Sequence, residues 1–201
     1  MTPLTRLAAF LQRVQGDVYP EEPSPLHDQI TRTMVQALLA RHPLPAGSRV
    51  LDVGCGQGLA LELFAEAGLD ATGITLGSDA EVCRSKGLSV RECDFADLDF
   101  DDESFDLVWA RHALEHSVVP AFLLSEFHRL TKPGGVLYVE VPAPDTACVH
   151  ETNPNHHSVL GKRMWLALIG RAGFAGVEGK DLQLTTAAGP DLYWAFMAQK
   201  P

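Results

Sequence analysis

A carboxylate and three alternating glycines stand close together in this chain, at Asp52, Gly54, Gly56 and Gly58, with Cys55 between the first two glycines. An apolar run precedes them and a helical pattern follows, so the segment predicts a strand, a tight turn and a helix. Because glycine has no Cβ, such a turn lets the backbone approach a ligand closely. The following helix also offers unpaired N–H groups. These residues therefore predict a ligand-binding loop.

The spacing of the glycines argues against a dinucleotide. The dinucleotide pattern is G-x-G-x-x-G/A, whereas the glycines here fall as G-x-G-x-G, and Leu59 or Leu61 occupies the place of the third small residue. Asp52 would repel a pyrophosphate, but it suits the ammonium group of a bound amino acid. An ordinary structural turn of an α/β protein is the alternative interpretation.

Two further stretches could bind a metal ion. Residues 94–103 are rich in Asp and Glu, and residues 148–157 contain Cys148, His150, His156 and His157. The first pattern is typical of a solvated loop. The second matches neither a zinc finger nor an H-E-x-x-H helix, so we expect no metal and interpret it as a polar lid over a substrate site.

Short apolar runs alternate with helical patterns from residue 50 onward, which is typical of a mostly parallel sheet covered on both faces. The expected strands are 50–53, 71–75, 89–93, 105–109, 136–141, 176–185 and 192–198. We expect turns at 132–135 and 187–191, the latter closing an antiparallel hairpin, and helices at 121–130 and before Gly173. Two amphipathic patterns, at 4–14 and 30–38, flank a Pro-rich link at 19–25; they form either a cap or ordinary packing on the sheet.

Several blocks, in order, resemble the class I S-adenosylmethionine (SAM)-dependent methyltransferases, in particular the small type 11 subgroup. The resemblance extends from about residue 50 to residue 142 and includes the glycine turn, the segments 93–98 and 110–116, and the Lys-Pro-Gly-Gly turn at 132–135. It implies a Rossmann-like, seven-stranded, mostly parallel sheet with a C-terminal antiparallel hairpin, helices on both faces and a helical N-terminal extension. It also implies SAM as cofactor and S-adenosylhomocysteine as product.

The resemblance assigns roles to individual residues. Asp94 would accept from the adenine amino group, and the Phe95 N–H would serve a ring nitrogen. Thr75 stands where the family usually has an acid that pairs with both ribose hydroxyls, so the ribose contact would be weaker. The residues expected to bind the cofactor are Asp52, Gly54, Cys55, Gly56, Gly58, Thr75, Leu76, Asp94, Phe95, Ala110 and Arg111.

Methyl transfer to an oxygen or nitrogen also needs a group that removes a proton. Histidine suits this task near neutral pH, and His112, His116 and His157 are the candidate bases, with His156 in the same loop as a further candidate. For His116, a structural role in the turn is the more favoured of the two interpretations. Arg111 could bind the methionine carboxylate or an acidic substrate.

Length and charge narrow the remaining choices. The 201 residues suit one domain, which we divide into a helical cap (1–45), a SAM-binding core (46–142) and a lid loop, helix and hairpin (143–201). The net charge of −10 makes a nucleic-acid substrate unlikely. We expect no signal peptide and no membrane anchor, and the four unpatterned cysteines favour the cytoplasm. The oligomeric state stays open.

The sequence thus predicts a SAM-dependent methyltransferase acting on an oxygen or nitrogen of a small molecule. The alternatives are a non-catalytic sensor or partner subunit that binds SAM or S-adenosylhomocysteine, another use of SAM on the same fold, and a methyltransferase acting on a macromolecule. Thr75 is the residue that favours the non-catalytic alternative.

Overall fold

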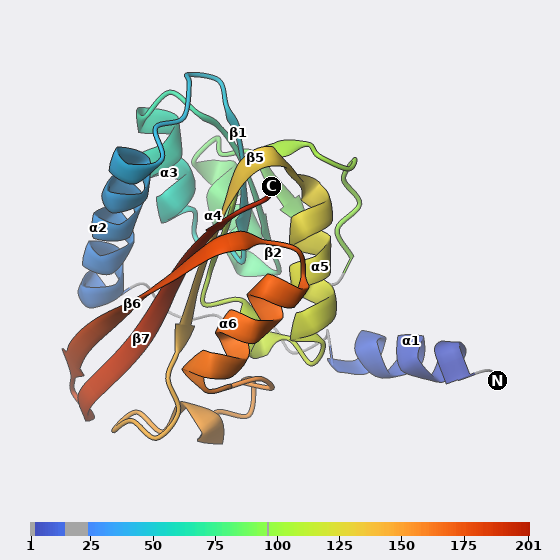
Figure 1. The fold of residues 1–201 in the computed structure, drawn as a ribbon, viewed down its shortest axis with the longest axis vertical. Coiled ribbons are helices and arrows are strands. Elements are labelled where there is room, and N and C mark those ends of the chain that lie inside the picture. Colours follow the sequence, from blue (N-terminus) through green and yellow to red (C-terminus); the bar gives the residue numbers. More distant parts are fainter. Residues whose placement is uncertain (1–2, 15–23, 96) are drawn as a thin grey trace.

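The computed structural model describes residues 3–14, 24–95 and 97–201, which form a seven-stranded sheet with helices on both faces (Figure 1). The strands are β1 (Arg49–Val53), β2 (Asp70–Thr75), β3 (Val90–Glu92), β4 (Phe105–Arg111), β5 (Thr131–Pro142), β6 (Ala175–Thr186) and β7 (Gly189–Gln199). The α-helices are α1 (Pro3–Val14), α2 (Pro25–Arg41), α3 (Leu59–Glu66), α4 (Ser78–Ser85), α5 (Pro120–Leu130) and α6 (Lys162–Arg171). Two short 3₁₀ helices are η1 (Leu114–His116) and η2 (His150–Thr152).

The strands follow the order β3-β2-β1-β4-β5-β7-β6 across the sheet. The first five are parallel to one another, and β7 runs antiparallel between β5 and β6. The predicted fold class is therefore confirmed. From β1 the chain continues to β2 and β3 on one side, and β4 lies on the other side, so the strand order reverses between β1 and β4. In open α/β sheets, ligands bind beyond the carboxyl ends of the strands at such a point.

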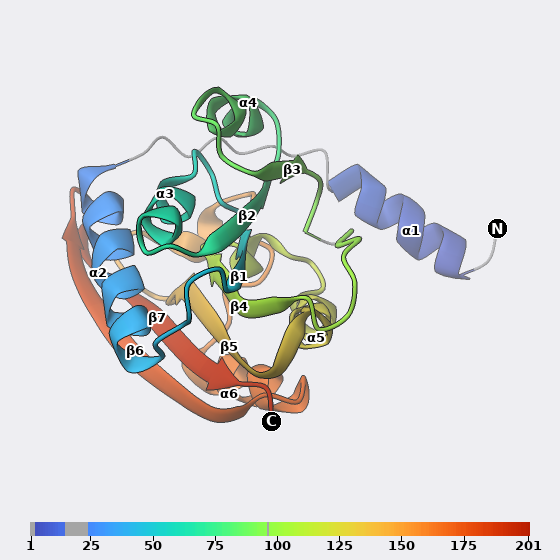
Figure 2. The same ribbon diagram turned by 90° about the horizontal axis from the view of Figure 1, so that it is seen from above.

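Helices bury an apolar stripe on each face of the sheet (Figure 2). On one face, α2 and α3 cover alternate residues of the central strands, and the core residues include Met34, Leu38, Phe64, Trp109 and Tyr138. On the other face lie α5 and α6, with Leu123, Phe127, Leu130, Trp165 and Ile169. Two-sided burial explains why the central strands are nearly continuous apolar runs.

Several predicted boundaries differ from those of the structure. The third strand is shorter than expected, since β3 spans only Val90–Glu92. The expected turn at 132–135 lies inside β5 as a bulge. Thr131 already pairs with Phe105, the Gly134 N–H donates to the Lys200 carbonyl, and the Lys200 N–H donates to the Gly135 carbonyl. Such an insertion bends a strand without ending its pairing.

The expected turn at 187–191 is also too long, because β7 begins at Gly189. Pro190 pairs with Thr185 in the hairpin, beyond the point where β5 ends opposite Tyr193. A proline is tolerated there because no β5 residue needs its missing N–H.

The N-terminal helices have different surroundings. Helix α2 begins where the Ser24 hydroxyl accepts from the His27 N–H, 3.2 Å away, and its apolar face belongs to the core. Leu7 and Phe10 on α1 are exposed. Of the predicted link at 19–25, residues 19–23 lie outside the described residues. No helix in the described part of the chain is both long and apolar enough to cross a bilayer.

Candidate active site

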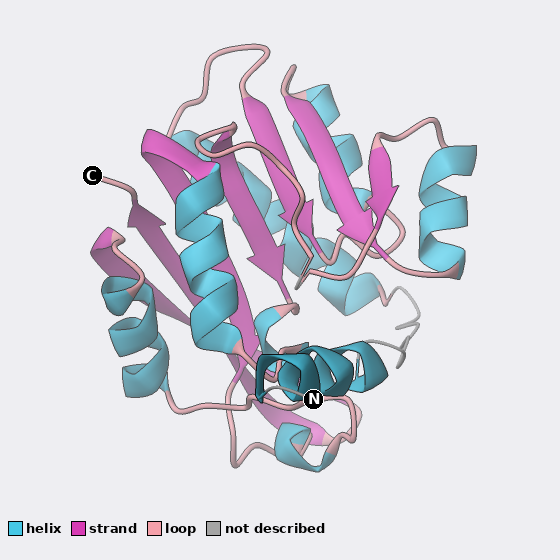
Figure 3. Cartoon of the chain, turned by 90° about the vertical axis from the view of Figure 1, so that its right-hand side faces the viewer, coloured by secondary structure: helices cyan, strands magenta, loops and turns pink. Residues whose placement is uncertain are grey.

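A cavity of about 300 Å³ lies at the carboxyl ends of β1, β2 and β4. In Figure 3 the heads of these parallel strands point toward the region that α1 crosses, and Leu11 and Val14 of α1 line the cavity. The other lining residues that matter below are His27, Thr31, Asp52, Gly54, Cys55, Gly56, Gln57, Thr75, Leu76, Asp79, Asp94, Phe95, Arg111, His112, His116, Asn155 and His157.

The glycine turn holds its shape through backbone bonds and left-handed glycines. The N–H groups of Gly54 and Cys55 both donate to the Ile74 carbonyl at 3.0 Å, which ties the turn to the end of β2. Gly54 and Gly56 have φ values of 73° and 49° and line the cavity. The space beside Gly56 is open, since the nearest atom to an added Cβ would be a carboxylate oxygen of Asp79 at 4.0 Å. A ligand can therefore lie directly against the backbone here.

Asp52 ends β1 as a buried carboxyl group beneath the turn. Its Oδ2 atom has no hydrogen-bond partner among the described residues. Burial raises the pKa of this carboxyl to about 8, although the Arg111 guanidinium counteracts part of the shift. A buried, unpaired acceptor of this kind is costly unless a ligand donates to it.

Arg111 is the last residue of β4, the strand that pairs with β1. Its Nε lies 2.8 Å from Glu140 Oε1, and its side chain is only 13% exposed. The Nη2 atom is buried and, within the described part of the chain, has no hydrogen-bond partner. The cavity thus contains a cationic donor from one strand end and a carboxyl acceptor from the next.

Glu140 compensates the buried charges behind Arg111. It is fully buried on β5, accepts from the Tyr138 hydroxyl at 2.6 Å, and faces His112 Nε2 at 3.3 Å. Although burial alone would raise it, the pKa of Glu140 falls to about 2 because Arg111 and His112 favour its charged form. Glu140 therefore stays ionised as an internal counter-ion.

His112 follows β4 with a φ of 52°, a left-handed conformation that is uncommon for residues with a side chain. Its Nδ1 contacts Glu115 Oε1 at 3.0 Å, while its Nε2 faces Glu140. Burial and Arg111 lower its pKa, but the two carboxylates outweigh them and raise it to about 9. Since carboxylates only accept, both ring nitrogens carry protons, and this geometry disfavours His112 as a base.

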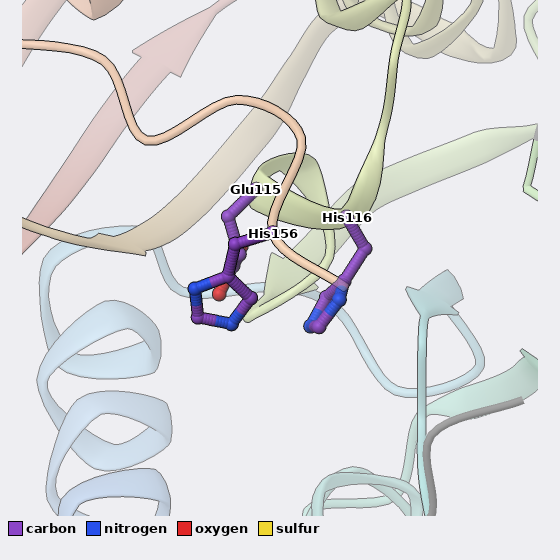
Figure 4. Close-up of side chains that lie close together, drawn as sticks. All are labelled: Glu115, His116 and His156. Carbon is purple, nitrogen blue, oxygen red and sulfur yellow. The ribbon is translucent and has the colours of Figure 1, made fainter. Parts of the chain in front are cut away.

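The other histidines predicted as candidate bases lie in η1 and in the loop after η2. His116 lines the cavity and its Nδ1 lies 3.0 Å from the Asn155 carbonyl. His157 is exposed at the mouth of the cavity, and its backbone N–H donates to the Glu115 carbonyl at 2.7 Å. His156 does not line the cavity; it lies beside Glu115 and His116 (Figure 4).

Comparison with known proteins gives this arrangement a family. Residues 51–139 match the family model described as "Methyltransferase domain". This match covers less than half of the chain, and over these residues the chain resembles a methyltransferase domain. The predicted resemblance to the class I SAM-dependent methyltransferases is thereby confirmed.

Curated relatives extend the match beyond this methyltransferase domain. The chain is 40% identical over 105 residues to the ubiquinone biosynthesis O-methyltransferase of Methylococcus capsulatus, covering 48% of this chain and 44% of that protein. It is 27% identical over 188 residues to the 27-O-demethylrifamycin SV methyltransferase of Amycolatopsis mediterranei, covering 84% and 69%. The chain spans less than half the length of the first of these relatives.

Solved structures show the same fold. A putative methyltransferase from Bacillus halodurans has a TM-score of 0.68 at 20% identity, covering 84% of this chain and 99% of that one. Phosphoethanolamine N-methyltransferase 2 of Haemonchus contortus, in complex with S-adenosyl-L-methionine, has a TM-score of 0.73 at 18% identity, covering 84% and 52%.

Most predicted site residues of the methyltransferase domain line the cavity, but two do not. Ala110 is fully buried within β4. Gly58 is the N-cap of α3, where an added Cβ would lie 2.4 Å from a methyl carbon of Leu88. Neither residue lines the cavity, and a cofactor contact for either stays a prediction.

The polar residues of this cavity that sequence reasoning missed include His27, Thr31, Gln57 and Asn155. His27 and Thr31 lie one turn apart at the start of α2, and the His27 ring stacks on that of His112 at 5.6 Å. Their four-residue spacing, in line with the buried Val35 and Leu38 of the same helix, was the available signal. It was too weak alone, because polar residues are common in the first turns of helices that bind no ligand.

Proposed function

We propose that this chain binds SAM in the cavity and transfers its methyl group to an oxygen or nitrogen of a small molecule. The observation that carries the proposal is the pair of buried, unpaired atoms at adjoining strand ends, Asp52 Oδ2 and Arg111 Nη2. These two atoms offer an acceptor and a donor for the ammonium and the carboxylate of one amino-acid group. The methionine end of SAM is such a group.

The adenosine end lies against the far side of the glycine turn. Thr75 and Leu76 follow β2, Asp79 lies in the first turn of α4, and Asp94 and Phe95 follow β3; all five line the cavity. In this arrangement Thr75 and Asp79 bind the ribose hydroxyls, and Asp94 and Phe95 bind the adenine. Asp79 faces the open space beside Gly56, so its carboxylate takes the place of the usual acid.

SAM supplies an activated methyl group on a sulfonium, so the chain's own residues mainly align the acceptor and exclude water. Leu11 and Val14 of α1 and the loop bearing His157 border the opening through which an acceptor enters. His157 is the candidate that receives the proton of the acceptor, because it is exposed to the cavity. Replacing it with Ala lowers turnover and leaves SAM affinity unchanged.

The size of the cavity and the relatives favour a small acceptor. Because SAM itself takes up much of the cavity of about 300 Å³, the remaining space suits only a small acceptor, and the net charge of −10 opposes nucleic acid. The relatives named above are an ubiquinone biosynthesis O-methyltransferase and a 27-O-demethylrifamycin SV methyltransferase. Oxygen is the favoured methyl-accepting atom.

The four cysteines are free thiols, which supports the cytoplasm as the compartment.

Calorimetric titration tests the proposal. SAM and S-adenosylhomocysteine bind the wild-type protein with one site, and NAD does not bind. Asp52→Ala removes the binding, whereas Asp70→Ala, which removes an exposed carboxylate at the start of β2, leaves the dissociation constant unchanged. Binding of NAD but not of SAM, or equal SAM affinity in the Asp52 variant, contradicts the proposal.

A further inference from the structure

Three side chains from two separate segments meet beside the cavity (Figure 4). Glu115 and His116 belong to η1, and His156 belongs to the loop that follows η2. One donor atom from each side chain lies within 4.8 Å of the donor atoms of the other two. The methyltransferase site described above uses neither Glu115 nor His156.

Both imidazole rings are oriented by backbone carbonyls. His116 Nδ1 lies 3.0 Å from the Asn155 carbonyl oxygen, and His156 Nδ1 lies 2.9 Å from that of His150. A carbonyl only accepts, so each Nδ1 carries the ring proton and, in the neutral ring, each Nε2 carries the lone pair. Metal-binding histidines are usually oriented in this way, by a hydrogen bond from their other ring nitrogen.

Glu115 supplies a buried carboxylate oxygen that no described residue satisfies. Its side chain is fully buried, and its Oε1 contacts the His112 ring at 3.0 Å. Its Oε2 has no hydrogen-bond partner in residues 3–14, 24–95 and 97–201. A buried carboxylate oxygen without a partner is costly, and a bound cation would remove that cost.

Backbone and serine hydrogen bonds hold the two segments together, and the metal-ligating atoms take no part in these bonds. The backbone N–H groups of His157 and Ser158 both donate to the Glu115 carbonyl, at 2.7 and 2.9 Å. The Ser158 hydroxyl donates to the Ser117 carbonyl at 2.6 Å. The donor atoms of the three side chains are therefore positioned before any ligand binds.

We propose that Glu115, His116 and His156 form a binding site for a divalent transition-metal ion. Two imidazoles and one carboxylate favour Zn²⁺ or Co²⁺ over Mg²⁺ or Ca²⁺, which prefer all-oxygen ligand sets. Ligand atoms at about 2.1 Å from an ion lie at most ~4.2 Å apart. The three ligand atoms here lie within 4.8 Å of one another, so they need to move only slightly closer.

A second group of potential ligands lies nearby, at Cys148, His150 and Asp191. Its donor atoms already contact one another or neighbouring residues. His150 Nε2 lies 3.1 and 3.0 Å from the two Asp191 carboxylate oxygens, and Cys148 Sγ lies 3.2 Å from the Thr186 hydroxyl. An ion would have to break these contacts, so this group is the weaker candidate.

The proposed metal site lies close enough to the cavity for its ion to reach a methyl acceptor. Three protein ligands leave at least one coordination position open, and His116 lines the cavity. An ion there could bind an oxygen of the acceptor, a consequence that rests on the proposed function. Ion binding itself does not depend on methyl transfer.

Metal titration of the chelator-treated full chain, without SAM, tests the site. Co²⁺ is followed by visible absorption and Zn²⁺ by calorimetry. We expect one ion per chain, and His116→Gln and His156→Gln each weaken binding by at least about 100-fold, because changes to outer-shell partners alone cost 10- to 100-fold. His150→Ala is the matched control: it removes a ligand of the second group but keeps the carbonyl that orients His156.

Circular dichroism checks that each variant is folded, and the two histidine variants are independent of each other. Unchanged affinity in His150→Ala together with loss in either folded histidine variant supports the site. The proposal is overturned if the wild type shows no saturable binding. It is also overturned if His116→Gln and His156→Gln both retain wild-type affinity, whether or not His150→Ala does.

Discussion

At the scale of single residues, the charge state of Asp52 controls how the cavity receives a cation. Burial holds its pKa near 8, so the free protein carries a mostly protonated carboxyl at pH 7. An ammonium group placed against Oδ2 favours the ionised form and lowers this pKa. Ligand binding and proton release are therefore linked at this residue.

This linkage predicts that SAM binding at pH 7 releases a proton from Asp52. Affinity rises with pH up to about 8, by at most about tenfold per pH unit, and levels off above that value because the carboxyl is then already ionised. Calorimetry in buffers with different ionisation enthalpies measures the release. Asp52→Asn removes this component, and an identical proton release in that variant would show that another group is responsible.

Glu140 is the second residue whose charge state matters, because it is the buried counter-ion of Arg111 and His112. Removing one partner of a buried ion pair leaves uncompensated charge in the interior. We predict that Glu140→Gln lowers the free energy of unfolding by about 3 kcal/mol, measured by urea denaturation.

The matched control for Glu140 is Glu178→Gln, which removes an exposed ion pair with Arg41. Exposed pairs contribute little, so this change costs less than about 1 kcal/mol. Equal losses in the two variants would mean that Glu140 is not a structural counter-ion.

At the scale of elements, β2 positions the glycine turn of β1. The Ile74 carbonyl accepts from two N–H groups of the turn, and Gly73 leaves room for the Cys55 side chain. A Cβ on Gly73 would lie 2.5 Å from Cys55 Sγ, a distance that requires the turn to move. The shape of the cavity therefore depends on a residue that does not line it.

We predict that Gly73→Ala weakens SAM binding by about tenfold and destabilises the fold by about 1–3 kcal/mol, because the interior is overpacked. Gly170→Ala is the control: it lies in α6 with no atom within 4 Å of an added Cβ, so it leaves binding unchanged and adds up to about 1 kcal/mol of stability. Titration and urea denaturation measure both effects. Unchanged SAM affinity in Gly73→Ala would contradict the role given to β2.

Elements were predictable where a local pattern decides them. The apolar run and glycines of β1 and its turn locate one side of the cavity, and the Leu123, Phe127 and Leu130 stripe locates α5. Boundaries set by a neighbouring strand were not predictable. The bulge at 132–135 forms backbone hydrogen bonds with Lys200, which is far from it in the sequence, and no local pattern records those contacts.

At the scale of the whole molecule, the sheet brings together residues far apart in the sequence. Asp52 and Arg111 meet because β1 and β4 are neighbours, which the strand order determines. The family resemblance assigned both residues to the cofactor site, so this part of the site was predictable, although the strand order was not. The approach of residues 155–157 to Glu115 depends on how the loop after β5 folds back, and a sequence pattern does not define it. The division into cap, core and lid stays a prediction.

The most direct test of the central claim is a crystal structure of the protein with S-adenosylhomocysteine. We predict that the ammonium lies within hydrogen-bonding distance of Asp52 and the carboxylate within that of Arg111, with the ribose beside Thr75 and Asp79 and the adenine beside Asp94. The sulfur then faces the cavity toward His157. A ligand bound elsewhere, or bound here with its amino-acid end away from Asp52 and Arg111, would contradict the account.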